Sequence, residues 1–400
     1  MAELQSVERA LEALLKDVKA GDVERIDCEA AAGRVLAEPV TARLDVPPAD
    51  NSAMDGYALR HVDAGQWLPI SQRIVAGHAP ESLTPGTCVR IFTGGEIPPG
   101  ADTVVMQERV EARVEAQDAQ AHIPGDITLG DNVRRRGRDV EAGTPLLEAG
   151  TRLEAAALGH LAGQGITQVD VYRRPRVALL STGDEIVDPS QSLAPGQIHN
   201  SNRPMLSRLL ERFGAELVMR EHVPDDFATT QRLLREAAER ADIIITTGGV
   251  SVGEEDHVKH ALESLGQLDL WQLAMRPGKP LALGRVGEAR LVGLPGNPVS
   301  CFVGAWVYLR PLIGAFLACP RMATLPRLWA RAAFTTHTQA RRHYMRVRLE
   351  FTPEGVVAHA FADQNSAVLS SCLEADALAV VPEHTTLNEG GRVECLWLTD

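Results

Sequence analysis

The chain has 400 residues, of which 44% are hydrophobic and 23% charged, which is enough for two to four packed domains. Its formal net charge of −13 argues against nucleic acid or an anionic membrane as partner, since either would need a broad basic field. We therefore expect no nucleic acid and no membrane among its partners. An anionic ligand would have to bind in a local basic pocket.

Neither a signal peptide nor a membrane span is expected. Residues 1–18 alternate charged side chains with Leu and Val at helical spacing, which predicts a surface helix. The longest apolar stretch, 299–309, is interrupted by Arg310 and Pro311 and is too short to cross a bilayer. The six cysteines form no CxxC pair, which favours reduced thiols. These features predict a cytoplasmic protein.

The predicted elements change character along the chain. After the helical start, short β-branched runs at 88–92, 102–106 and 143–147 predict strands within a middle region rich in Gly and Pro. From residue 175, strands alternate with helices, which predicts a doubly wound α/β domain. Its expected strands lie near 177–180, 217–218, 243–245, 281–283 and 291–292, and its expected helices at 204–213, after Asp226, at 256–265 and at 298–317. Alternating strands beyond Pro320, near 345–349 and 392–396, predict a small β domain.

Three polar loops each follow an apolar strand of the α/β segment, at 181–185, 246–253 and 294–300. If the strands are parallel, these loops share the carboxyl edge of one sheet, where open α/β proteins bind ligands. Gly248, Gly249 and Gly253 would let the backbone approach a phosphate closely, and Ser251 adds a hydroxyl donor. One such loop alone would be an ordinary tight turn, but three at one edge predict a phosphate site.

Residues 249–253 also match the G-x-S-x-G nucleophile elbow of α/β hydrolases, so a serine esterase that uses Ser251 is an alternative function. Asp256, His257 and His260 follow in the order of a catalytic triad. The alternative is disfavoured because these residues lie so close to Ser251 in sequence that they could hardly bracket it. The Walker motif is absent from the sequence, which disfavours a P-loop nucleotidase.

Basic side chains follow in segment 275–280. Pro277 and Pro280 stiffen this loop, so Arg276 and Lys279 should be presented in a fixed geometry with little entropy left to lose. We interpret the loop as an oxyanion-binding segment, with an ordinary solvated turn as the alternative.

Six ordered motifs, at 50–58, 93–102, 181–185, 248–253, 277–280 and 294–300, together resemble the MoeA-type molybdopterin molybdenumtransferases, the family that includes the gephyrin E domain. The resemblance covers nearly the whole chain and implies a multidomain α/β fold. It implies an elongated N-terminal domain (residues 1–44 and 141–173), an inserted β-rich domain (45–140), a doubly wound molybdopterin-binding α/β domain (174–319) and a small C-terminal β-barrel domain (320–400).

The resemblance also implies an enzyme of molybdenum cofactor biosynthesis that requires Mg²⁺. Molybdate and adenylylated molybdopterin would be its substrates, and molybdenum cofactor and AMP its products. Its expected partners are a second copy of the chain, in a homodimer with the active site between the subunits, and the upstream molybdopterin adenylyltransferase. A non-catalytic pterin-binding scaffold, as the gephyrin relatives suggest, is the remaining alternative.

Cleavage of a phosphoanhydride needs charge neutralisation and positioning more than a protein nucleophile. By resemblance, the expected metal ligands are Asp184, Glu185 and Asp256. The expected catalytic residues are these three with Asp55, Thr93, Asp225 and Lys279, of which Asp55 and Thr93 would come from the facing subunit. The expected substrate-binding residues are Ser181, Thr182, Gly183, Ser201, Asn202, Gly248, Gly249, Ser251, Gly253, Arg276, Pro280, Pro295, Gly296, Asn297, Pro298 and Ser300. From the residues alone, Asp225 and Asp226 could equally cap a helix.

Some positions depart from the family pattern or match it loosely. Arg276 stands where a lysine is usual, and it replaces a compact ammonium by a planar guanidinium, which would change the geometry offered to an oxyanion. Gln272 also occupies a position that is often lysine. In the C-terminal domain, the side chains near positions that resemble the family's oxyanion contacts are Arg342, Arg346, Ser366 and Ser370.

Overall fold

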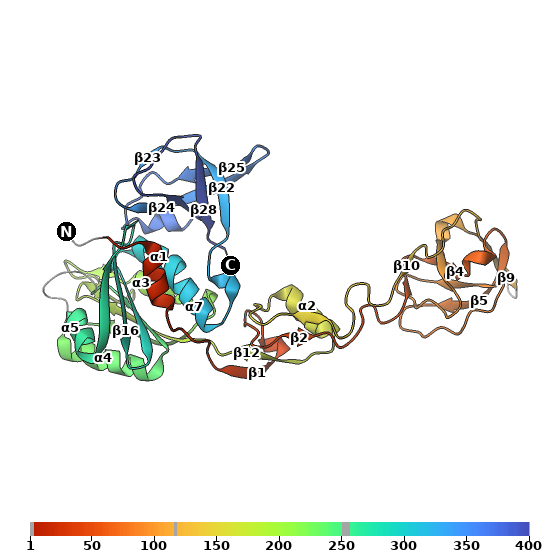
Figure 1. The fold of residues 1–400 in the computed structure, drawn as a ribbon, viewed down its shortest axis with the longest axis horizontal. Helices are drawn as coiled ribbons and strands as arrows, with labels where there is room; N and C mark the ends of the chain where they lie inside the picture. The colour runs from red at the N-terminus through yellow and green to blue at the C-terminus, as the bar shows by residue number, and fades with distance from the viewer. Residues whose placement is uncertain (1–3, 116–117, 250–256, 400) are drawn as a thin grey trace. The chain divides into compact units, whose positions relative to one another are not determined.

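The computed structural model describes residues 4–115, 118–249 and 257–399. The chain forms two compact units (Figure 1), of which the first comprises Met1–Ala37, Gly150–Glu154 and Gln168–Asp400, and the second comprises Glu38–Ala149 and Ala155–Thr167. Each unit is built from segments that are distant in sequence. The boundaries of the four expected domains stay a prediction.

The second unit is built on a six-stranded sheet of order β7-β4-β6-β5-β9-β8. Its strands are β4 (Gly56–Leu59), β5 (Trp67–Ile74), β6 (Cys88–Ile91), β7 (Thr103–Met106), β8 (Glu111–Glu115) and β9 (Asp118–His122). Tyr57 and Leu59 of β4 pack into one apolar cluster and Ala58 into another, so this strand is buried on both faces. The unit also contains α2 (Ala155–Gly163) and two short strand pairs, β2 (Val40–Thr41) with β11 (Pro145–Leu147) and β3 (Asn51–Ser52) with β10 (Val133–Arg134).

The first unit contains a six-stranded mixed sheet of order β16-β13-β17-β21-β20-β18. The strands β13 (Arg176–Thr182), β16 (Glu216–Val223), β17 (Ile243–Thr247) and β21 (Ala289–Leu294) are parallel, as expected of an α/β domain. The strands β18 (Gly266–Gln272) and β20 (Pro280–Val286) are antiparallel to their neighbours. A tight turn joins β20 directly to β21, so these two neighbouring strands form a hairpin rather than a crossover unit.

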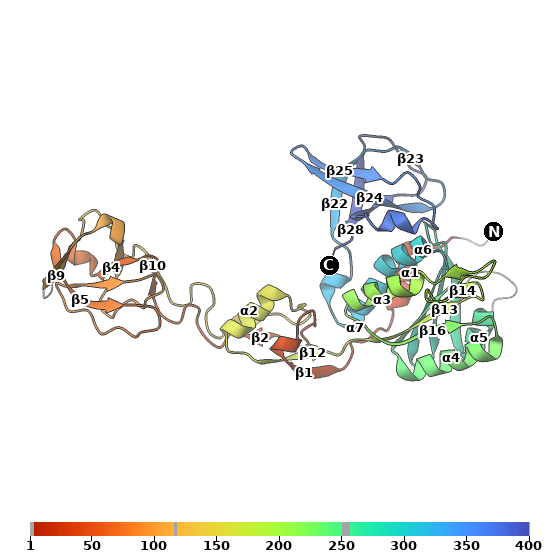
Figure 2. The same ribbon diagram turned by 180° about the vertical axis from the view of Figure 1, so that it is seen from behind.

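Helices cover both faces of this sheet (Figure 2). Val177 and Leu179 of β13 join the core formed with α1 (Val7–Leu15), α3 (Asn202–Arg212) and the helical segment Pro298–Phe316, whereas Ala178 and Leu180 join the core formed with α4 (Phe227–Arg240) and α5 (His257–Leu265). Alternate side chains of one strand therefore point into two cores. The expected N-terminal surface helix is α1, which buries one face, including Leu14.

The predicted helix at 298–317 consists of α6 (Pro298–Gly304), a π-helical stretch (Ala305–Leu309) and α7 (Arg310–Phe316). Among the described residues it alone is long and apolar enough to cross a membrane, but 78% of its most apolar window is buried inside the protein. Core helices of soluble proteins pass the same test, so the helix is weak evidence for a membrane span.

The C-terminal region closes into a five-stranded barrel. Its strands are β22 (Arg327–Ala332), β24 (Arg342–Thr352), β25 (Gly355–Ala360), β26 (Ala377–Val381) and β28 (Arg392–Trp397), and the pairing of β24 with β26 completes the ring. A strand from the α/β region, β19 (Met275–Arg276), pairs with β24 and places Arg276 beside His343. Segment 275–280, which we interpret from the sequence as an oxyanion-binding loop, is thus attached to the barrel. The remaining short strands are β1 (Val23–Asp27) with β12 (Gln168–Tyr172), β14 (Ile186–Val187) with β15 (Ile198–His199), and β23 (Thr336–His337) with β27 (Thr386–Leu387).

Candidate active site

The three polar loops begin at one edge of the sheet, because the strands that precede them, β13, β17 and β21, are adjacent and parallel. The loop after β17 requires glycine at its first position. Gly248 has φ +89°, and a Cβ there would lie 2.8 Å from the hydroxyl oxygen of Thr182. The Gly248 N–H donates to the carbonyl of Leu294 at 3.0 Å, which ties this loop to the next strand. Close packing of two loops, rather than a turn alone, explains this glycine.

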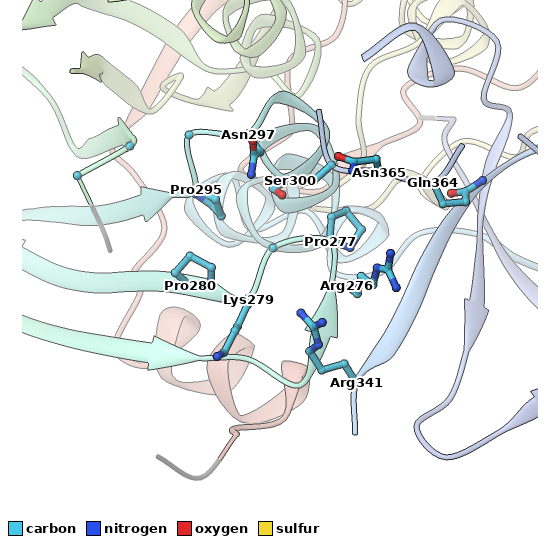
Figure 3. A pocket seen from close by; sticks show the side chains of 15 residues that line it. Arg276, Pro277, Lys279, Pro280, Pro295, Asn297, Ser300, Arg341, Gln364 and Asn365 are labelled. Carbon is cyan, nitrogen blue, oxygen red and sulfur yellow. The ribbon is translucent and has the colours of Figure 1, made fainter. Parts of the chain in front are cut away.

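A cavity of about 380 Å³ opens at this edge (Figure 3). It gathers nine of the predicted site residues: Gly248, Gly249, Arg276, Lys279, Pro280, Pro295, Gly296, Asn297 and Ser300. It also contains Pro277, Gly278, Arg341, Gln364, Asn365 and Ser366. In the close view, Arg276 and Lys279 project from segment 275–280, and Arg341 lies near them. Gln364 and Asn365 lie on the side of the barrel.

The pocket is basic. Arg276, Lys279 and Arg341 line it without a carboxylate partner in the part of the chain that the structure describes, and the lining contains no Asp or Glu. In a chain with a net charge of −13, this is a local positive pocket of the kind that an anionic ligand needs. Three cations that have no acidic partner among the described residues favour a multiply charged anion over a neutral ligand.

The oxyanion loop is held at both ends. Its carbonyl at Lys279 accepts from the N–H of Leu273 at 2.7 Å, and Arg276 belongs to the strand that pairs with the barrel. Burial, followed by the nearby charges of Arg276 and Arg341, lowers the pKa of the neighbouring His343 to about 4. His343 is therefore neutral near pH 7 and adds no charge to the basic pocket.

Asp184 of the first polar loop and Asp225, which follows β16, each accept a hydrogen bond from the backbone of the other. The N–H of Asp225 donates to Oδ1 of Asp184 at 3.0 Å, and the N–H of Asp184 donates to Oδ2 of Asp225 at 3.4 Å. Glu185 folds over Gly183, where a Cβ would lie 2.3 Å from the Glu185 carboxylate. The helix cap is Asp226, whose carboxylate accepts from the N–H of Thr229 at 2.7 Å, so Asp225 remains available for another role.

The other substrate-binding candidates that the structure describes lie outside the lining of the pocket. Asn202 donates from Nδ2 to the carbonyl of Gly296 at 2.7 Å. Its Oδ1 and the Ser181 hydroxyl are buried and have no hydrogen-bond partner within the described ranges. The Thr182 hydroxyl donates to the carbonyl of Thr247 at 3.2 Å. Ser201 precedes α3 without a side-chain cap bond, and Pro298 begins α6. The lining itself includes none of these side chains.

The C-terminal residues are arranged differently from the sequence expectation. Arg342 is paired with Glu8 and with Glu383, the latter at 3.5 Å, and does not line the pocket. Its neighbour Arg341 does, together with Gln364 and Asn365, which the sequence reasoning missed. Of the other candidates, Ser366 lines the pocket, whereas Arg346 is buried behind it and Ser370 lies outside the lining.

Asp55 and Thr93 lie together in the second unit. The N–H and the hydroxyl of Thr93 both donate to Oδ1 of Asp55 at 2.8 Å, and these bonds lower the pKa of Asp55. The carboxylate is therefore held ionised in one orientation. That these two residues face the site of a second subunit stays a prediction.

Three predicted site residues, Ser251, Gly253 and Asp256, lie outside the described residues. Among the residues that are described, no group of three or more His, Cys, Asp or Glu side chains could hold a metal ion. The expected ligands Asp184 and Glu185 are nevertheless adjacent at the carboxyl edge. Mg²⁺ commonly uses only one or two protein carboxylates together with substrate phosphates and water, so this donor set fits the ion.

Comparison with protein families divides the chain into three matched regions. Residues 5–165 match the MoeA N-terminal region (domain I and II), residues 178–315 match a domain described as "Probable molybdopterin binding domain", and residues 330–398 match the MoeA C-terminal region (domain IV). The α/β region with its basic pocket is thus of the class of such molybdopterin-binding domains.

Relatives extend this likeness over the whole chain. The molybdopterin molybdenumtransferase of Haemophilus influenzae is 41% identical over 293 residues, covering 72% of each chain, and that of Bacillus subtilis is 33% identical over 402 residues, covering 96% of this chain and 92% of the relative. The crystal structure of the molybdopterin biosynthesis MoeA protein from Pyrococcus horikoshii covers 100% of both chains with a TM-score of 0.80 and 30% identity. The chain belongs to the MoeA family of molybdopterin molybdenumtransferases.

Proposed function

We propose that this member of the family inserts molybdate into adenylylated molybdopterin with release of AMP, and that the basic pocket is where the oxyanion and the pterin phosphate meet. The observation that carries the proposal is the convergence of Arg276, Lys279 and Arg341, without a carboxylate partner in the described chain, at the carboxyl edge of the sheet. Both substrates are anions, and three fixed cations would hold them together against their mutual repulsion.

The residues of the pocket offer different kinds of contact to the two anions. The backbone at Gly248 and Gly249 permits close approach of a phosphate, and Ser300 offers a hydroxyl from the first turn of α6. Lys279 contributes a compact charge, whereas the planar guanidinium of Arg276 can form two parallel bonds to an oxyanion. Cleavage of the phosphoanhydride then depends on orientation and charge neutralisation, and requires no protein nucleophile.

We further propose that Asp184 and Glu185, with Asp256, hold Mg²⁺. When bound there, the ion would neutralise charge on the phosphates as the bond to AMP breaks. Asp225 would keep the Asp184 loop in place, because each of these two residues binds the other's backbone. Chelation of Mg²⁺ should therefore stop AMP release, and addition of Mg²⁺ should restore it.

The partners and the compartment are also proposals. A homodimer would bring Asp55 and Thr93 of one subunit to the pocket of the other, and an adenylyltransferase must supply the adenylylated substrate. No disulfide joins any of the six cysteines within the described residues, which supports a reducing compartment such as the cytoplasm.

The test is an assay of AMP release from adenylylated molybdopterin, with and without molybdate. We expect release to depend on molybdate and to fall by about a hundredfold or more in Lys279→Ala, because a charged contact to the reacting anions is lost. Lys19→Ala, which removes an exposed lysine outside the pocket, should behave as wild type. AMP release that is indifferent to molybdate would contradict the proposal. Running the assay with tungstate would define the oxyanion preference.

The same protein tests the two alternatives. A serine esterase should be labelled by a fluorophosphonate probe at Ser251, and the family membership does not favour this reading. A scaffold without chemistry should release no AMP under any of these conditions.

A further inference from the structure

A buried arginine organises the barrel side of the pocket. Arg346 in β24 is only 1% exposed. Its guanidinium donates from Nη2 to the carbonyls of Asp363 (3.3 Å) and Asn365 (3.2 Å), and from Nη1 to the carbonyl of Gln364 (3.1 Å). Its Nε donates to the hydroxyl of Ser371 at 2.9 Å. One side chain therefore donates hydrogen bonds to three consecutive carbonyls of the loop that lines the pocket.

Further bonds fix this loop along its length. The Gln364 amide bonds both the N–H and the carbonyl of Arg346, each at 3.0 Å. The Ser371 hydroxyl donates to the carbonyl of Val368 at 2.7 Å. At the pocket, the carbonyl of Ser366 accepts from the N–H of Val299 at 3.1 Å, which joins the loop to the start of α6. The loop is thus held by the barrel on one side and by the α/β region on the other.

Peptide geometry decides where the N–H groups of this loop point. In a planar trans peptide the C=O and the following N–H point in opposite directions, so the N–H groups of residues 364–366 point away from the guanidinium. That of Asn365 is bound by the carboxylate of Asp363 at 2.8 Å. Within the described ranges, those of Gln364 and Ser366 meet no protein acceptor, although both residues line the pocket.

We propose that the backbone N–H groups of Gln364 and Ser366 donate to the oxyanion in the pocket, and that Arg346 is the positioning residue that holds them there. Successive oriented N–H groups form an anion-binding concavity, and they would complement the cations across the pocket. Only a planar group with five donors can satisfy three neighbouring carbonyls and a hydroxyl together, so lysine should not replace it. This inference rests on the proposed function and extends it.

The chain contains a matched control. Arg310 is likewise only 3% exposed and donates to the backbone carbonyls of Met322 (2.9 Å), Thr324 (3.1 Å) and Arg321 (3.2 Å). None of these residues lines the pocket. Loss of a buried guanidinium at either position should destabilise the protein, but only one of the two should affect anion binding.

The experiment compares Arg346→Lys with Arg310→Lys by thermal unfolding and by steady-state kinetics. We expect both variants to have a lower Tm. Only Arg346→Lys should raise a KM, by about tenfold, with kcat at saturation changed by less than about twofold, because the lost contact holds a bound anion. A higher KM for molybdate would assign the N–H pair to molybdate, and a higher KM for the adenylylated pterin would assign it to the ligand phosphate.

The inference is overturned if Arg346→Lys leaves both KM values unchanged, or if Arg310→Lys raises them equally. Should Arg346→Lys fail to fold, Ser371→Ala decides, since it removes one partner of the guanidinium and should raise the same KM by about threefold.

Equilibrium dialysis with molybdate distinguishes a failure of this inference from a failure of the proposed function. Binding that weakens in Ser371→Ala, in a protein that releases no AMP, would contradict only the proposed function. AMP release with KM values that neither substitution alters would contradict only this inference.

Discussion

Two neighbouring arginines show how much depends on a single position. Arg341 lines the basic pocket, whereas Arg342 is occupied by Glu8 and Glu383. We predict that Arg341→Ala raises the KM for an anionic substrate by about tenfold, because a charged contact is lost. Arg342→Ala should leave KM unchanged and lower the free energy of unfolding by at most about 1 kcal/mol, since its ion pairs are partly exposed. Equal KM values in the two variants would show that the pocket is wrongly assigned.

His343 should make stability depend on pH. An unfolded histidine binds its proton near pH 6.5, whereas burial and the nearby arginines lower the pKa of His343 to about 4 in the folded protein. Between these values the unfolded chain binds more protons, so the free energy of unfolding should fall as the pH falls from about 6.5 to about 4. In His343→Gln this part of the dependence should be absent. Denaturant unfolding at several pH values measures it, and identical slopes in both proteins would refute the prediction.

At the residue scale, the pocket was predictable where chemistry and sequence position coincide. Lys279 and Ser300 belong to loops whose composition already indicated an anion site, and both line the pocket. Arg341 gave no such signal, because a pair of adjacent arginines before a strand does not reveal which one faces inward. Arg346 lies near a position that resembles the family's oxyanion contacts, and only the structure shows that its donors are turned toward backbone carbonyls.

At the scale of elements, the adjacent residues Asp225 and Asp226 have different roles at the start of α4. Asp226 caps α4. We predict that Asp226→Ala lowers the free energy of unfolding by about 1 kcal/mol, as loss of an N-cap does, with little change in AMP release. Asp225→Ala should impair AMP release without a comparable loss of stability, because it frees the Asp184 loop. Urea unfolding and the AMP assay, applied to both variants, would reveal a reversed pattern if the roles are exchanged.

The sheet was predictable to the extent that local pattern specifies it. Apolar runs such as Ile243–Thr247 predicted parallel strands, and their parallel order brings the polar loops to one edge. The hairpin of β20 with β21 was not predicted, because an apolar run does not state its direction. Nor was the pairing of β19 with β24, since two residues carry no periodicity.

At the scale of the whole molecule, the proposed homodimer predicts complementation between inactive variants. Asp55→Ala and Lys279→Ala would each be inactive alone if both residues serve one site. If the site takes Asp55 from one subunit and Lys279 from the other, a mixed dimer has one intact site. An equimolar mixture after subunit exchange should regain about a quarter of wild-type AMP release, since half of the dimers are mixed and each restores one of two sites.

The control for complementation is a mixture of Lys279→Ala with the double variant Asp55→Ala/Lys279→Ala, which leaves no intact site in any dimer. Recovery in that mixture, or none in the first one despite exchange confirmed by mass spectrometry, would rule out a shared site.

The sequence by itself determined the family, the α/β core and the chemistry of the pocket, because these depend on local periodicity and on motifs that act within one loop. Only the tertiary structure decided which arginine enters the pocket, that the barrel supplies residues 364–366, and that a buried guanidinium holds them. These features arise from contacts between segments far apart in the chain. The residues of these features share no sequence pattern. They lie close together because β19 pairs with β24, which joins the α/β region to the barrel.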